Sequence, residues 1–162
     1  MPLFYFAWTF RIIPYANNFY VQDRTEYLTG KKFWSQKEFI FESMSVRGES
    51  YVFEVYKFND ETSEFFEQSD SLFFAEFPPD NMTDIRWTRT PIEKSEKEIL
   101  EFVLSFHNSQ DKELMKWQNI IREEAYKSRS YYSYSQRVIR QKTYFYIIIP
   151  EMNYIGIIYL NT

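Results

Sequence analysis

The sequence predicts an α+β domain, with a mostly antiparallel sheet, two helices packed on one face of that sheet and a terminal β-hairpin. Two observations predict this architecture: strand-like runs near both ends of the chain and a capped periodic segment between them. No internal repeat or low-complexity linker divides the chain. The 162 residues lie within the usual length of one domain, so we expect a single domain over 1–162.

The first expected strand covers residues 3–12, where the side chains alternate with period two. One of its faces is fully apolar and carries Phe4, Phe6, Trp8, Phe10 and Ile12. Two β-rich runs, 37–46 and 50–58, then flank Arg47-Gly48-Glu49. This pattern predicts a hairpin, because glycine supplies the turn.

The last two apolar runs, 143–149 and 154–160, predict the terminal hairpin, with 150–153 as its short loop. Their nearly continuous apolar character is typical of central strands. Gly156 interrupts the second run and indicates either a bulge or close packing at that point.

Two helices are expected between these strands. The motif Thr90-Pro91-Ile92-Glu93 predicts a helix that begins with Thr90 as N-cap, because it combines a capping box with proline at the first helical position. Its expected apolar stripe is Ile92, Ile99, Phe102, Val103 and Phe106. A second helix, capped by Asn108 or Ser109, is expected to run to about Tyr126. Its expected stripe is Leu114, Trp117, Ile120 and Ile121.

The segment 61–77 mixes acids with pairs of phenylalanines and fits neither the helical nor the strand period. A short helix followed by a strand is one interpretation, but we favour irregular structure, leave a strand near 72–77 open, and place a boundary at Pro78-Pro79.

The residue types exclude many catalytic chemistries. Cysteine is absent, which excludes thiolate nucleophiles, zinc ribbons and iron–sulfur ligation. The three glycines are isolated, so neither a P-loop nor a dinucleotide fingerprint is present. The single histidine, His107, is interpreted as a helix-end residue. Catalysis is therefore the less favoured interpretation, and we expect no cofactor and no metal.

One catalytic alternative stays open, a metal-dependent hydrolase built from carboxylates. Mg²⁺ needs only one or two carboxylates together with water, and Asp60, Glu61 and Asp84 are candidates.

The opening residues contain neither a basic n-region nor a small-residue cleavage site, and no apolar run reaches the ~18 residues of a membrane span. We therefore expect a cytoplasmic protein that does not enter a membrane. The low glycine content with abundant Phe, Tyr, Ile and Asn resembles the usage of AT-rich genomes, including those of phages and mobile elements.

Charge is distributed unevenly along the chain although its net value is only -4. Residues 54–84 contain nine acids against Lys57, whereas residues 112–142 contain eight bases against three acids. Either the two segments pair with each other in the fold or each faces a partner, and the sequence leaves both interpretations open.

Our first hypothesis is a non-catalytic interaction module that binds a protein partner through exposed aromatics and charged segments. The candidate partner-binding residues are Phe65, Phe66, Glu61, Glu64 and Glu67. Exposed aromatic side chains concentrate interface energy and the surrounding charge steers the encounter. The alternative interpretation places the phenylalanines in the core.

Our second hypothesis is a nucleic-acid-binding protein. Its candidate residues are Lys127, Arg129, Tyr131, Tyr132, Tyr134, Arg137 and Arg140. As a strand, this segment would alternate basic side chains and aromatic stacking groups on one face, as a protein that binds single-stranded nucleic acid requires. As a helix, it would bury the tyrosines and leave a basic rim. We favour the helix.

Overall fold

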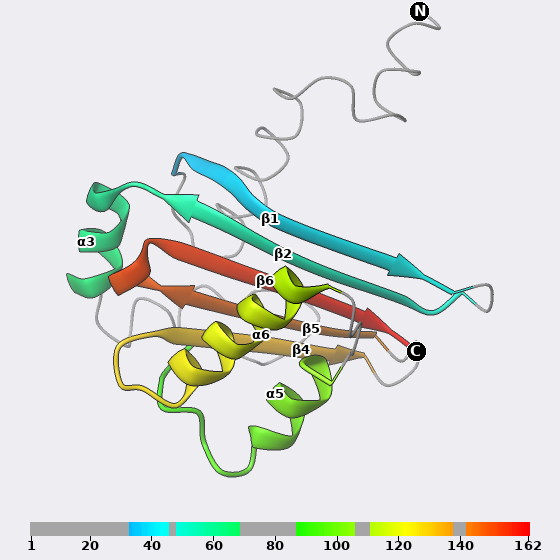
Figure 1. Ribbon diagram of the computed structural model, residues 1–162. Helices are drawn as coiled ribbons and strands as arrows, with labels where there is room; N and C mark the ends of the chain where they lie inside the picture. Colours follow the sequence, from blue (N-terminus) through cyan, green and yellow to red (C-terminus); the bar gives the residue numbers. More distant parts are fainter. Residues whose placement is uncertain (1–32, 46–47, 69–86, 106–110, 138–141) are drawn as a thin grey trace, which may run out of the picture.

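The computed structural model describes residues 33–45, 48–68, 87–105, 111–137 and 142–162. These residues form an α+β fold in which helices pack on an antiparallel sheet, as the sequence predicts (Figure 1). The expected strand at 3–12, the open strand near 72–77 and the boundary at Pro78-Pro79 lie outside the described residues. The same is true of Asp84, Phe106, His107, Asn108, Ser109 and Arg140.

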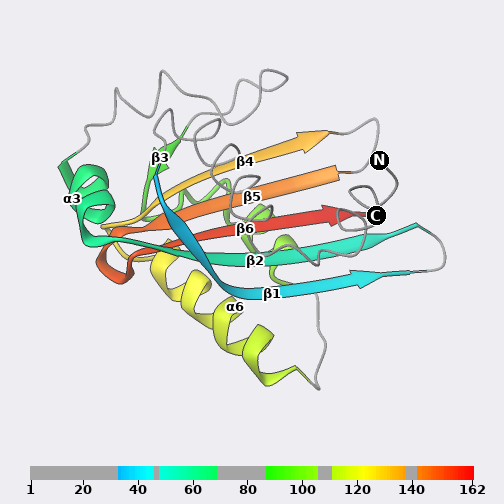
Figure 2. The same cartoon turned by 90° about the horizontal axis from the view of Figure 1, so that it is seen from above.

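The sheet has six strands in the order β1-β2-β6-β5-β4-β3, and every described pairing is antiparallel (Figure 2). The strands are β1 (Ser35–Met44), β2 (Ser50–Phe58), β3 (Thr88–Arg89), β4 (Tyr131–Arg137), β5 (Lys142–Ile149) and β6 (Tyr154–Asn161). Both predicted hairpins are confirmed as β1–β2 and β5–β6. The predicted central position of the terminal hairpin is also confirmed, since β5 and β6 occupy the middle of the sheet.

Local turn chemistry explains the two hairpins. Gly48 adopts a φ of 87°, a left-handed conformation that glycine reaches without steric cost, and it closes the turn between β1 and β2. The turn between β5 and β6 is the short 3-10 helix η2 (Pro150–Met152), which ends at Asn153 in the left-handed region. Asparagine tolerates that conformation better than most residues.

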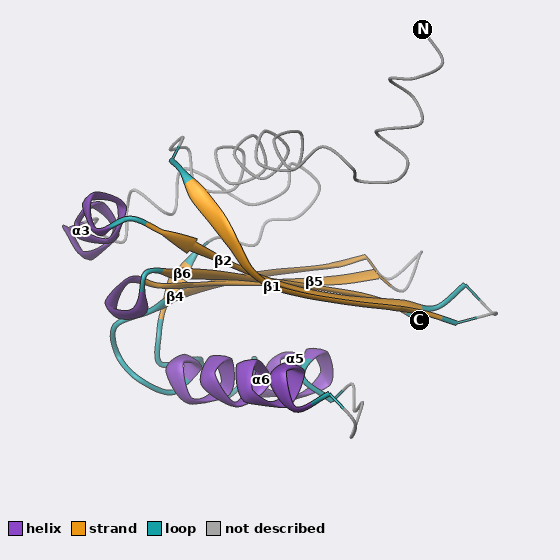
Figure 3. Cartoon of the chain, turned by 45° about the horizontal axis from the view of Figure 1, so that its top comes forward, coloured by secondary structure: helices purple, strands orange, loops and turns teal. Residues whose placement is uncertain are grey.

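The two faces of the sheet carry two separate hydrophobic cores, because successive side chains of a strand point to opposite faces. Along β5, Phe145 and Ile147 belong to the core under the helices α5 (Lys97–Val103) and α6 (Lys112–Ala125). Tyr146 and Ile148 belong to the other core, which includes Phe66 from the helix α3 (Asp60–Gln68). Figure 3 shows α5 and α6 together on one side of the sheet, with α3 apart from them at one end.

The helix predicted to have Thr90 as its N-cap has Glu96 as its N-cap and begins at Lys97, so this prediction is wrong by six residues. The Thr90 hydroxyl does not cap a helix. It donates to the Ser130 carbonyl oxygen at 3.0 Å and accepts from the Ser130 amide at 2.9 Å. This contact spans 40 residues, so no local pattern reveals it. The predicted stripe is confirmed in part, since Ile92 and Val103 are buried, but Phe102 is 42% exposed, and Leu100 and Leu104 are buried although they were not predicted.

The second predicted helix is confirmed as α6. Its stripe of Leu114, Trp117 and Ile121 is buried, and its C-cap is Tyr126. The N-cap is Asp111, whose carboxylate accepts from the amides of residues 113 and 114. Asp111 follows the two cap candidates that the sequence suggests.

Gly156 marks close packing rather than a bulge, because β6 pairs without a register shift there. A Cβ atom at this position would lie 2.8 Å from Ile121 Cδ1 and 3.0 Å from Ile147 Cγ2. Such contacts are shorter than van der Waals separation, so glycine lets α6 approach the sheet closely.

Two further expectations are wrong. Residues 60–68 form the helix α3, which was the alternative, rather than the favoured irregular structure. Asn59 caps this helix, since its Oδ1 accepts from both the amide and the hydroxyl of Thr62. Residues 131–137 form the strand β4 rather than a helix. Pairing with β5 over the whole of β4 decides this, since tyrosine and serine have no strong helical preference.

Candidate partner-binding surface

Helix α3 is anchored to the sheet by its inward side. Phe66 is fully buried and packs against Phe33 and Phe58 with ring centroids 5.6 and 5.7 Å away. The Ser63 hydroxyl donates to the Pro150 carbonyl oxygen at 2.6 Å, and the Tyr131 hydroxyl donates to the Phe66 carbonyl oxygen at 2.8 Å. These contacts fix α3 relative to β4 and to the β5–β6 turn.

The outward side of α3 carries an acidic face, which we define as Asp60, Glu61, Glu64 and Glu67, all exposed. Asp60 Oδ1 accepts from Asn153 Nδ2 at 2.6 Å. No cation of the described ranges lies within ion-pair distance of any of the four carboxylates. The last turn of α3 contains no base, so Glu67 meets the negative end of the helix dipole without compensation.

The structure separates the five candidate partner-binding residues into two groups. Glu61, Glu64 and Glu67 project from the acidic face of α3. Phe65 is half-buried and packs edge-on against Phe66, with ring centroids 5.3 Å apart. Phe66 belongs to the core, so its ring is not available to a partner.

The tyrosines of β4, candidates for base stacking, are embedded in the two cores. Tyr131 and Tyr132 are 2% and 1% exposed, and Tyr134 is half-buried against the core under the helices. The ring of Tyr132 stacks on Phe145 instead, with centroids 6.2 Å apart and an interplanar angle of 13°. Stacking on a nucleic-acid base requires an open ring face.

The hydroxyls of Tyr132 and Tyr134 both donate to the carboxylate of Glu96, at the start of α5. Burial raises the pKa of both phenols, and Glu96 raises it further because it disfavours a phenolate beside a carboxylate. The pKa of Tyr134 rises to about 12. Near neutral pH these tyrosines are therefore un-ionised hydrogen-bond donors that connect β4 to the start of α5.

The basic candidates before β4 are exposed and already paired. Lys127 Nζ lies 2.6 Å from Glu124 Oε1, and Arg129 Nη1 pairs with Glu151. Hydrogen bonding to these carboxylates raises the pKa of Lys127 and of Arg129. Arg137 belongs to β4, but the structure does not describe its side chain, and Arg140 lies outside the described residues.

A shallow depression of about 250 Å³ joins the acidic and the basic segments. We call it the charged depression, and it is lined by Glu67, Arg89, Arg129, Tyr131 and Glu151. Glu67 adds to the negative field that raises the pKa of Arg129. The guanidinium of Arg89 lies over the ring of Tyr131, with Cζ 5.7 Å from the centroid. Residues from both charged segments of the sequence therefore meet here.

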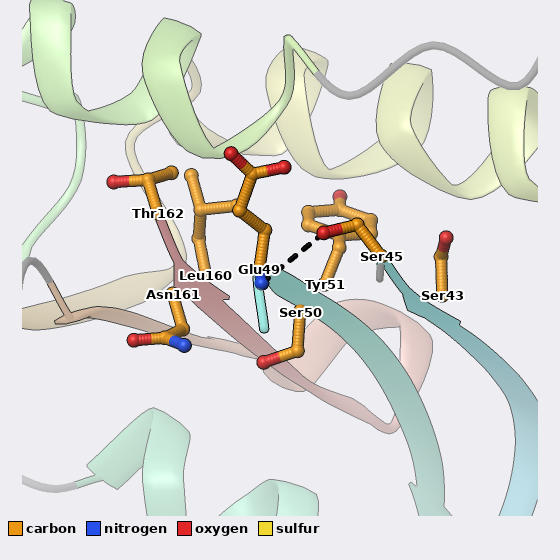
Figure 4. Close-up of a pocket in the computed structure, with 8 residues that line it drawn as sticks. All are labelled: Ser43, Ser45, Glu49, Ser50, Tyr51, Leu160, Asn161 and Thr162. Atoms are coloured by element: carbon orange, nitrogen blue, oxygen red, sulfur yellow. Dashed lines mark hydrogen bonds between the residues drawn. The ribbon is translucent and has the colours of Figure 1, made fainter. Parts of the chain in front are cut away.

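A second depression of about 270 Å³ lies at the other end of the sheet (Figure 4). It is lined by Ser43, Ser45, Glu49, Ser50, Tyr51, Leu160, Asn161 and Thr162. The Tyr51 hydroxyl is occupied, since it donates to the Val103 carbonyl oxygen and accepts from Gln118. Glu49 is the only carboxylate side chain among the lining residues that the structure describes, so this depression offers no carboxylate pair for acid–base catalysis.

Within the described part of the chain, no group of three or more His, Cys, Asp and Glu side chains converges to hold a metal ion. Of the magnesium candidates, Asp60 and Glu61 lie on the acidic face of α3, and Asp84 is outside the described residues. None of the described helices is long and apolar enough to span a membrane.

Comparison with known proteins gives no match for this chain: no family model, no curated protein and no solved structure matches it. The properties of its surface therefore rest on the residues themselves.

The sequence did not single out Arg89 or Glu151, two of the five residues in the charged depression. Arg89 comes from the two-residue strand β3 and Glu151 from η2. Their partners Tyr131 and Arg129 are 42 and 22 positions away in the chain, and no local motif marks such contacts.

Proposed function

We propose that this protein is a non-catalytic interaction module that binds a basic segment of a protein partner on the acidic face of α3. The observation that supports this most directly is the exposure of four carboxylates on two turns of one helix without a described counter-ion.

Stability considerations support the proposal. Glu61, Glu64 and Glu67 follow one another at spacing i,i+3, where like charges are neighbours and destabilise a helix by about 0.2–0.5 kcal/mol per pair. Glu67 is also unfavourable at the helix C-terminus. Asp60 and Glu61 lie in the first turn, where acids favour a helix, but the repulsion among the three glutamates and the position of Glu67 do not. A role in recognition therefore accounts for the row of glutamates better than a role in the fold.

The surroundings of the acidic face suit a protein partner. Phe65 lies on α3 next to Glu64, is half-buried, and offers a partner apolar contact beside the acids. Exposed charge of one sign accelerates association with an oppositely charged partner, and a neighbouring aromatic ring adds contact area. The anchoring of α3 through Phe66 keeps this surface in place, which limits the entropy lost on binding.

The test is affinity capture from cells of the source organism, with both proteins and nucleic acids identified. The variant E61Q/E64Q/E67Q removes the charge but keeps good helix formers, so α3 remains folded. The matched control is E98Q/E113Q/E123Q, which removes three exposed carboxylates from α5 and α6.

We expect the wild type and the control to retain the same protein and the α3 variant to lose it. Equal retention by all three forms would contradict the proposal. Recovery of nucleic acid alone, with a steep loss at higher salt, would favour the nucleic-acid alternative through exposed residues such as Lys127 and Arg129.

A further inference from the structure

We infer that Arg89 is a receptor for a carboxylate, so that the partner segment carries basic side chains followed by one carboxylate group. This inference rests on the proposed function, because it assigns a ligand group to the charged depression, which adjoins the acidic face of α3. The charged depression begins where the acidic face of α3 ends, since Glu67 belongs to both.

The position of the Arg89 guanidinium is prepared before binding. Arg89 and Tyr131 are direct partners in the β3–β4 ladder, and the guanidinium lies over the Tyr131 ring. That ring is itself fixed, because Tyr131 is buried and its hydroxyl is bonded to the Phe66 carbonyl oxygen of α3. A guanidinium stacked on an aromatic ring keeps its planar edge of donors for a carboxylate and loses little side-chain entropy on binding.

The two arginines of the depression differ in their partners. Arg129 is paired with Glu151, so its charge is compensated within the molecule. Arg89 is exposed, and no described carboxylate lies within ion-pair distance of it. The depression therefore presents one cation, Arg89, and one anion, Glu67, that have no described partner within ion-pair distance.

This charge pattern is complementary to a segment with charges of both signs. A basic side chain of the partner would lie against Glu67, and a carboxylate would lie at Arg89 in the same depression. The carboxylate can come from an acidic side chain or from the C-terminus of the partner chain, since both have the same planar oxygen pair.

Three short oligolysine peptides test the inference. The first ends in a free carboxylate, the second is amidated, and the third is amidated with glutamate as its last residue. Their affinities are measured at low salt by fluorescence anisotropy for the wild type, for Arg89→Gln and for Lys116→Gln. Lys116 is the matched control, because its ammonium lies 5.5 Å over the ring of Trp117 on α6, away from α3.

We expect the wild type and Lys116→Gln to bind at least one carboxylate-bearing peptide about two- to fivefold more tightly than the plain amidated peptide, as for an exposed ion pair. Arg89→Gln should lose this preference and bind the carboxylate-bearing peptides no more tightly than the plain amidated peptide. A preference for the first or for the third peptide identifies the terminal or the side-chain source.

Equal binding of all three peptides to the wild type would overturn the role of Arg89 and leave the acidic face of α3 as a binding surface. If no peptide binds the wild type, or if E61Q/E64Q/E67Q binds them as well as the wild type does, the proposed function fails together with this inference.

Discussion

Helices α6 and α3 are built on the same plan but use their charges differently. Each has a side-chain cap, Asp111 for α6 and Asn59 for α3, and each buries one side, which carries large apolar residues in α6 and the single ring of Phe66 in α3. Around α6 the charges are paired: Arg122 of α6 pairs with Glu101 of α5 at 3.2 Å, and Lys127, which follows α6, pairs with Glu124. On α3, four carboxylates stand without a described cation.

The difference separates surface charge that supports the fold from surface charge that does not. The pair Glu101–Arg122 joins the two helices. Lys97, four residues before Glu101, lies over the ring of Tyr126, four residues after Arg122, so the two helices run antiparallel. The charges of α6 therefore position α5. On α3, Glu61, Glu64 and Glu67 repel one another, and no described cation pairs with them, which is why we assign these glutamates to partner binding.

The largest expected effect tests whether α3 is as integral to the fold as α6. Phe66→Ala should lower the free energy of unfolding by about 3–5 kcal/mol, because it removes a fully buried ring. Phe65→Ala, at the half-buried neighbour, should cost clearly less. Urea unfolding measures both. Equal and small losses would show that α3 is attached only loosely, and the comparison with α6 would not hold.

The close packing of α6 on the sheet is tested by adding a side chain at Gly156. Gly156→Val should destabilise the protein by about 1–3 kcal/mol, since new side-chain atoms would clash with Ile121 and Ile147. Ile121→Val removes the Cδ1 atom of the closest contact. The double variant should therefore be less destabilised than the sum of the single variants. Strict additivity in urea unfolding would argue against this contact.

The tie between β4 and α5 should weaken at high pH. The folded-state pKa of Tyr134, about 12, lies above the value of ~10 for an unfolded chain. The unfolded chain therefore loses this proton first, and stability should fall as the pH rises from ~10 towards 12. Tyr134→Phe should make that fall shallower and cost about 0.5–1.5 kcal/mol at neutral pH. The measurement is the urea midpoint of both proteins between pH ~10 and 12. If the midpoint of Tyr134→Phe falls with pH as steeply as that of the wild type, the prediction is wrong.

The smallest expected effects have opposite signs in the two helices. Glu64→Gln should stabilise the protein by about 0.2–0.5 kcal/mol, because it relieves repulsion with Glu61 and Glu67. Arg122→Gln should destabilise it by about 0.2–1 kcal/mol, because it removes the pair with Glu101. Thermal unfolding at low and high salt measures both, and salt should reduce both effects. Destabilisation by Glu64→Gln would show that the acids of α3 support the fold.

Elements with a complete local signal were predicted correctly. The β1–β2 hairpin, the terminal hairpin and α6 each show their period over many residues, and the turn or the end of the helix is marked in the chain. For the candidate surface, the sequence indicated Glu61, Glu64 and Glu67 by their charge. It did not show that Phe66 would be buried or that Arg89 would join Glu67.

The sequence by itself determined the fold class, both described hairpins and the acidic character of one segment, because these depend on residue types and short-range periodicity. Tertiary contacts decided the rest. Pairing with β5 made 131–137 a strand, and the bond from Thr90 to Ser130 moved the start of α5 to Lys97. The burial of Phe66 fixes the orientation of α3, and in that orientation its acids face outward. Each of these outcomes depends on partners distant in the chain, whose free energy of packing and hydrogen bonding exceeds the weak local preferences.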